Sequence, residues 1–84
     1  MRNDWLITFR SVTFAQKAHS VLLKAGINSA MQRTPRALSE RGCGYCLLMR
    51  GQDVSDAVQM LQHWQITYGK IYEMKDGHPQ EQRV

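Results

Sequence analysis

Apolar residues occupy every second position from Trp5 to Phe9, in a short run rich in β-branched and aromatic side chains that extends to Arg10. A period of two predicts a strand, here with Trp5, Ile7 and Phe9 on one face. The apolar residues that follow recur at helical spacing, and Thr13-Phe14-Ala15-Gln16 has the form of a capping box at the start of this helix. Its apolar stripe comprises Phe14, Ala18, Val21, Leu22 and Ala25, with Gly26 as the C-terminal stop.

A second strand and a second helix are predicted in the other half of the chain. The apolar run from about Gly44 to Arg50 predicts a strand, and Asp53 is expected to cap the next helix. The inner face of this helix is expected to hold Val54, Ala57, Val58, Leu61 and Trp64. Two further strands are predicted over residues 27–33 and 67–74, and Thr34-Pro35-Arg36 opens a short helical turn through about Glu40 that Gly42 ends.

The two halves resemble each other in their pattern. When Ala18 is aligned with Ala57, Leu22 falls on Leu61 and Ile7 falls on Cys46. The order β-α-β, turn, β-α-β predicts an α+β fold of the ferredoxin-like split βαβ type, a four-stranded antiparallel sheet in the order 4-1-3-2 with two helices on one face. In this topology the end of the first strand adjoins the start of the third, which places Cys43 beside Arg10 and Ser11.

Length and composition limit the domain organisation. The chain has 84 residues, of which 43% are hydrophobic, enough for one small core and not two. We therefore expect a single domain over residues 1–74 and a flexible C-terminal tail over residues 75–84, where there is almost nothing to bury. The polar start resembles neither a signal peptide nor a membrane span, so a cytoplasmic location without membrane contact is expected.

The charge pattern favours a small anionic group over a nucleic acid. The formal charge is +4, from 11 Lys and Arg against 7 Asp and Glu. Five of the arginines lie at the ends of predicted elements and not in one run: Arg10, Arg33, Arg36, Arg41 and Arg50. The predicted sheet also lacks the aromatic motif of an RNA-binding sheet.

The only two cysteines stand in Cys43-Gly44-Tyr45-Cys46, at the start of a predicted strand. Cys46 is aligned with Ile7 in the repeat of the two halves, which predicts that Cys46 is a small buried residue beneath the helices. Cys43 precedes the strand and is expected to meet the N-terminus of the first helix, together with Arg10 and Arg36. Positive charge of this kind stabilises a thiolate and lowers the pKa of a cysteine.

A C-x-x-C motif has two other common uses, a thiol-disulfide pair and a zinc site. In thioredoxin-like proteins the motif opens a helix, whereas here it enters a strand, so a thiol-disulfide pair of Cys43 and Cys46 is a less favoured alternative. Zinc would need more ligands than one cysteine pair and the scattered His19, His63 and His78 supply. We therefore predict neither a metal nor a cofactor.

Three segments and a short motif carry a resemblance to a known family. They are residues 6–11 (Leu-Ile-Thr-Phe-Arg-Ser), 22–27 (Leu-Leu-Lys-Ala-Gly-Ile) and 34–39 (Thr-Pro-Arg-Ala-Leu-Ser), followed by Gly42-Cys43-Gly44. Over about residues 5–73 the chain resembles the Se/S carrier protein-like family, whose members are small single domains or modules fused to sulfurtransferase-like proteins. One departure is Trp64-Gln65, where an Ala-Gly pair is more typical.

The resemblance implies a carrier of sulfur or selenium that holds a persulfide or selenopersulfide on Cys43, more than a classical enzyme. The residues expected to stabilise or flank the thiolate are Arg10, Ser11, Thr34, Arg36, Gly42 and Gly44. The implied partners are donor and acceptor proteins that resemble cysteine desulfurases and sulfurtransferases.

A binding or regulatory module without covalent chemistry is the alternative. The sheet face away from the helices is expected to expose apolar side chains, namely Leu6, Tyr45, Leu47, Met49 and Tyr72. A second copy could cover this face in a homodimer, or the arginines could bind a small anion as a sensor. An acid-base enzyme is disfavoured, because no carboxylates form an evident pair around a pocket.

Overall fold

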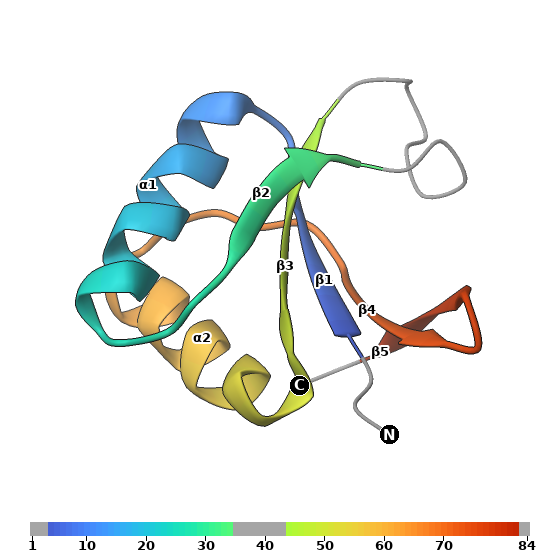
Figure 1. Cartoon of the computed structure of the whole chain (residues 1–84). Coiled ribbons are helices and arrows are strands. Elements are labelled where there is room, and N and C mark those ends of the chain that lie inside the picture. Colours follow the sequence, from blue (N-terminus) through green and yellow to red (C-terminus); the bar gives the residue numbers. More distant parts are fainter. Residues whose placement is uncertain (1–3, 35–43, 83–84) are drawn as a thin grey trace.

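The computed structural model describes residues 4–34 and 44–82 of the chain. The elements in this part are β1 (Asp4–Phe9), α1 (Val12–Lys24), β2 (Ala30–Arg33), β3 (Tyr45–Arg50), α2 (Gly51–His63), β4 (Ile71–Lys75) and β5 (His78–Gln82). Both helices cover the same face of an antiparallel sheet (Figure 1). The predicted α+β class with two helices on one face is therefore confirmed.

The predicted sheet of four strands in the order 4-1-3-2 needs a correction. The sheet has five strands in the order β2-β3-β1-β4-β5, so β5 extends the sheet beyond β4. Asp76 and Gly77, with φ values of 51° and 79°, join β4 to β5, and Lys75 pairs with His78. Two turn residues with positive φ form the type I′ hairpin that Asp-Gly favours. The expectation of a flexible tail is thus wrong for residues 78–82, because β4 supplies partners for their backbone groups.

Several expected element boundaries also shift. Strand β2 begins at Ala30 and β4 at Ile71, later than expected. Ser11, and not the Thr13 of the expected capping box, is the N-cap of α1. Helix α2 begins without a side-chain cap, and Asp53 lies in its first turn. Beyond Thr34, the expected helical turn falls outside the described residues.

One core fills the space between the helices and the sheet. The buried residues of α2 are Val54, Ala57, Val58 and Leu61, as expected. Ile7 and Phe9 of β1 also lie in this core, and Trp5 packs against it. Trp64 was expected on the inner face of α2 but is 56% exposed, because the helix ends at His63, one residue before it.

The register of the central strands reverses the face that was expected for Cys46. Ile7 lies opposite Leu47, and both belong to the core beneath the helices. Cys46 lies opposite Thr8, and since successive residues of a strand point to opposite faces, its side chain lies on the face away from the helices. Cys46 is nevertheless fully buried. The expected burial is confirmed, and the expected position beneath the helices is wrong.

Unequal connections explain this reversal. Arg10 and Ser11 separate β1 from α1, whereas α2 begins directly after β3. One constant shift therefore cannot align both the strands and the helices, and an error of one residue turns every side chain of a strand to the other face.

The register of β3 also changes which residues lie on the sheet face away from the helices. Tyr45, Leu47 and Met49 lie on the helix side of the sheet, in the core or packed against it. Leu6 and Tyr72 are paired on the opposite face, where Leu6 is buried and Tyr72 is half-buried. Three of the five residues expected on the open face thus lie on the other side of the sheet, whereas Leu48, paired with Leu6, takes a place on the open face. A homodimer through this face stays a prediction.

Candidate functional site

The predicted site residues that the structure describes lie where β1 and β2 end and where α1 and β3 begin. Phe9 is paired with Tyr45, and Arg10 and Ser11 lead from β1 into α1. Thr34 follows β2 directly and donates its backbone N–H to the carbonyl oxygen of Gly44 at 3.2 Å. We refer to Phe9, Arg10, Ser11, Thr34 and Gly44 as the Gly44 junction.

Gly44 occupies a place that other residues would fill poorly. Its φ is 135°, in the region that favours glycine. A Cβ atom at this position would stand 3.1 Å from the carbonyl oxygen of Phe9 and 3.5 Å from Oγ1 of Thr34. The missing side chain thus lets β3 begin close against the end of β1.

The N-terminus of α1 adds positive potential to the junction. The Ser11 hydroxyl accepts a hydrogen bond from the backbone N–H of Phe14 at 3.3 Å. The first turn of α1 has no acidic side chain, and Arg10 is exposed directly before the cap. Because helix N-termini carry partial positive charge and unpaired N–H groups, this end of α1 favours a nearby anion.

Thr34 brings a buried hydroxyl group to the same place. Its Oγ1 is buried and makes no hydrogen bond of ordinary geometry within the described parts of the chain. Buried polar atoms without a partner are uncommon in proteins. A hydroxyl in this condition can turn its proton toward an anion.

Cys46 lies two residues beyond Gly44, in β3. Its Sγ donates a weak hydrogen bond to the carbonyl oxygen of Arg33 at 3.9 Å. Burial raises the pKa of this thiol, and the side chains of Gln32 and Thr34 partly oppose that effect because they would donate to the thiolate. The neutral thiol is therefore the stable form of Cys46.

Gln32 was not singled out by the sequence. It lies opposite Cys46 in the pairing of β2 with β3. Only the register of two strands far apart in the sequence places its side chain beside the sulfur, so no local pattern could have revealed it.

Three predicted site residues, Cys43, Arg36 and Gly42, lie outside the described residues. Cys43 is bonded to Gly44, and the other two belong to the segment that links Thr34 to Gly44. The roles of all the expected site residues stay predictions. Of the four that the structure describes, Thr34 is hydrogen-bonded to Gly44, and Arg10 and Ser11 follow Phe9, against which Gly44 lies.

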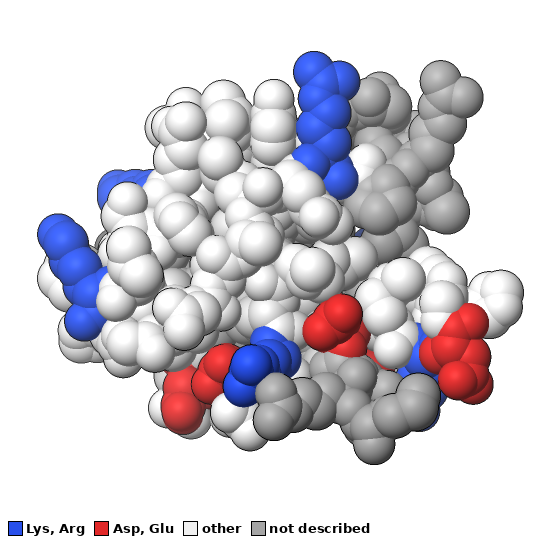
Figure 2. All heavy atoms as spheres, in the orientation of Figure 1, with Lys and Arg blue, Asp and Glu red and all other residues white. Residues whose placement is uncertain are grey.

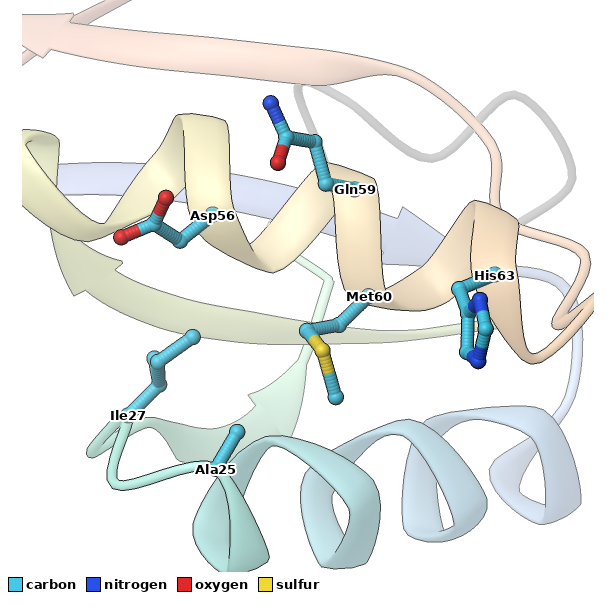
Figure 3. A pocket seen from close by; sticks show the side chains of 6 residues that line it. All are labelled: Ala25, Ile27, Asp56, Gln59, Met60 and His63. Atoms are coloured by element: carbon cyan, nitrogen blue, oxygen red, sulfur yellow. The ribbon is translucent and has the colours of Figure 1, made fainter.

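A separate hollow of about 570 Å³ lies between α1 and α2. Met60 and His63 extend from α2 toward α1, and Asp56 and Gln59 lie along the same helix (Figure 3). Ala25 and Ile27, at the end of α1, complete the lining. No residue of the Gly44 junction lines this hollow.

Other kinds of site find little support in residues 4–34 and 44–82. No group of three or more His, Cys, Asp or Glu side chains there could hold a metal ion. No helix in this part of the structure is long and apolar enough to cross a membrane. On the face shown in Figure 2, the Lys and Arg side chains stand apart from one another, and several lie beside acidic ones.

A family model described as "Putative Se/S carrier protein-like" matches residues 4–73. The match begins with β1 and extends into β4, so it includes the Gly44 junction and Cys43 and leaves β5 outside. Neither a curated protein nor a solved structure matches the chain.

Proposed function

Because the chain belongs to the "Putative Se/S carrier protein-like" family, we propose that it holds a sulfur or selenium atom on Cys43 and passes it between proteins. The family description indicates the cargo, and a cysteine is the side chain that binds such an atom covalently. Cys46 is fully buried and favours the neutral thiol. Cys43, bonded to Gly44 at the junction, is the better nucleophile for a partner protein to meet.

The proposed transfer is an exchange between thiols. The Cys43 thiolate attacks the outer sulfur of a donor persulfide, a new S–S bond forms, and the donor cysteine leaves as a thiolate when its own S–S bond breaks. An acceptor thiolate then attacks the same outer sulfur, and Cys43 leaves as a thiolate. Each step exchanges one S–S bond for another with no net gain or loss of electrons, so the exchange needs no cofactor.

The observation that carries this proposal is that Gly44 lies against Phe9, three residues before α1, and that the first turn of α1 has no acidic side chain. Free helix N–H groups, the exposed Arg10 and the Thr34 hydroxyl each favour negative charge nearby. A thiolate or persulfide anion on the residue bonded to Gly44 would be stabilised by this arrangement. Arg36 would add a further positive charge.

The proposed partners are proteins with reactive thiols, a donor that resembles a cysteine desulfurase and an acceptor that resembles a sulfurtransferase. Gly42 and Gly44 flank Cys43 in the sequence. Residues without side chains on both sides would let a partner's active site approach the sulfur closely.

Loading by a cysteine desulfurase, measured by intact mass, tests the proposal. The parent protein and Cys46→Ser are expected to gain a sulfur atom, and Cys43→Ser is not. Arg10→Gln should load more slowly, whereas Arg50→Gln, which removes an exposed arginine from the opposite end of β3, should load like the parent. If Cys43→Ser loads as well as the parent, the proposal is wrong.

A further inference from the structure

A second thiol close to a persulfide threatens the cargo. If the Cys46 thiolate attacked the inner sulfur of a Cys43 persulfide, a Cys43–Cys46 disulfide would form and the outer sulfur would leave as hydrosulfide. The S–S bond of the persulfide breaks in this step, the Cys46 sulfur is oxidised and the outer sulfur is reduced. The proton of Cys46 passes to solvent beforehand. No outside oxidant is needed, so a carrier with both cysteines must prevent this reaction.

The position of Cys46 in the sheet opposes such an attack. Strand β3 lies between β1 and β2, and Cys46 is paired with Thr8 on one side and Gln32 on the other. The side chain is fully buried on the face away from the helices. The backbone of Cys46 is thus held by a neighbouring strand on each side, which restricts the movement of its sulfur.

The backbone before Cys46 also resists closure of the bridge. Bridged cysteines have Cα atoms about 4.4–6.8 Å apart, whereas extended residues advance about 3.3 Å each. A bridge between residues 43 and 46 therefore requires a tight turn with residues 44 and 45 at its centre. Tyr45 is instead extended and paired with both Phe9 and Arg33, and the carbonyl of Gly44 accepts a hydrogen bond from Thr34. The start of β3 would have to detach from both neighbouring strands.

The surroundings of the sulfur reduce its nucleophilicity as well. The Arg33 carbonyl accepts a hydrogen bond from the neutral thiol and would repel a thiolate. Because burial outweighs the effect of Gln32 and Thr34, the nucleophilic thiolate is scarce.

We infer that the pairing of β3 with β1 and β2 sequesters Cys46, so that Cys43 can hold its cargo three residues away without forming an internal disulfide. The inference rests on the proposed function for the identity of the cargo. The protection itself is a property of the sheet and should act against any leaving group on Cys43.

An aromatic disulfide reagent tests the protection without a persulfide. One equivalent of reagent should leave a stable mixed disulfide on Cys43 of the folded protein, with release of a first coloured thiolate. Attack by Cys46 would release a second one. In urea sufficient to open the sheet, this second release should be at least about tenfold faster than in the folded protein. Cys46→Ser and Cys46→Ala should abolish it in both conditions, and the use of two variants guards against a substitution that impairs folding.

The outcomes of this experiment are distinct. A second release as fast in the folded protein as in urea would overturn the inference, because Cys46 would then be free to attack. The absence of a second release in urea would also overturn it, because no protection would be needed. If no mixed disulfide forms on the folded protein, the inference fails together with the proposed function, since the sheet would have nothing to protect.

A persulfide-loaded protein then separates the two ideas. Folded parent and folded Cys46→Ser should release hydrosulfide at rates within about twofold of each other. Markedly faster release from the parent would overturn the inference and leave the carrier function standing. Failure of Cys43 to load, with a stable mixed disulfide in the previous experiment, would contradict the carrier function and leave the sequestration of Cys46 standing.

Discussion

Gly44 lies against Phe9 so closely that a Cβ atom on residue 44 would stand 3.1 Å from the Phe9 carbonyl oxygen. Gly44 follows Cys43 in the chain, and Phe9 precedes Arg10 and Ser11. This contact therefore brings together the two chain segments from which the proposed site is built.

Replacement of Gly44 by alanine should destabilise the protein. The substitution forces a side chain into a backbone conformation with φ of 135° and into contact with Phe9, and we expect a loss of about 1–3 kcal/mol in the free energy of unfolding. Gly77→Ala is the control, because φ there is 79° and a Cβ would meet nothing within 4 Å. Urea unfolding measures both variants. A Gly44→Ala protein no less stable than Gly77→Ala would show that the contact with Phe9 is unimportant.

Substitutions of Ser11 separate its capping role from its effect on charge. Ser11→Ala should lower the free energy of unfolding by about 1 kcal/mol, whereas Ser11→Asp preserves a capping oxygen and should cost little. The aspartate nevertheless adds negative charge at the Gly44 junction, so alkylation of Cys43 at neutral pH should be slower in Ser11→Asp than in the parent. Equal alkylation rates in these two proteins would argue against a Cys43 thiolate near the start of α1.

The buried thiol of Cys46 predicts a specific dependence of stability on pH. Burial raises its pKa in the folded protein, while in the unfolded chain the pKa should lie near the ordinary value of 9.0. Below the unfolded pKa both states are protonated and the contribution of the thiol is fully present. As the pH rises toward the folded pKa, the unfolded chain loses its proton first and stability falls. Between about pH 8 and 10, the free energy of unfolding should therefore fall more steeply in the parent than in Cys46→Ala. Parallel pH profiles would contradict the assignment of Cys46 as a buried neutral thiol.

The two helices end in the same hydrogen-bond pattern but with different residues at the left-handed position. The N–H of Ile27 donates to the carbonyl of Leu22, and that of Ile66 to Leu61, each at 2.9 Å. The residues between helix and isoleucine are Gly26, with φ of 83°, and Gln65, with φ of 56°. Glutamine pays a steric cost in this conformation that glycine avoids.

An exchange of these residues tests that account. Gln65→Gly should raise the free energy of unfolding by about 0.5–1 kcal/mol, and Gly26→Gln should lower it by about 1 kcal/mol. Opposite shifts in the urea midpoint would agree with this prediction. A Gln65→Gly variant less stable than the parent would show that the glutamine side chain makes a compensating contact.

The helices and the central strands were predictable because the residues of each buried apolar face recur at the spacing typical of a helix or of a strand. Val54, Val58 and Leu61 recur at helical spacing, and Ile7 and Phe9 alternate with other residues, as their burial later requires. The face of Cys46 was not predictable from periodicity. It depends on the register of β3 against β1 and on the absence of a linker between β3 and α2.

The C-terminal hairpin shows a different limit. Residues 78–82 have little to bury, so an argument from apolar content predicts no structure for them. Backbone pairing across Asp76-Gly77 produces β5 regardless, and this dipeptide was a usable signal. For the site, the adjacency of Gly44 to the end of β1 followed from topology. The positions of Thr34 and Gln32 beside Cys46 required the register of β2.

The central claim, that Cys43 carries a transferable sulfur atom, is tested most directly when that atom is located in the loaded protein. After alkylation, cleavage following Tyr45 separates the peptide of Cys43 from the peptide of Cys46. Mass spectrometry of the loaded protein should then find an added sulfur atom on the Cys43 peptide. When an acceptor protein with a reactive thiol is supplied before alkylation, the added sulfur atom should be lost from this peptide. Added sulfur on the Cys46 peptide, or sulfur on Cys43 that no acceptor thiol removes, would contradict the account.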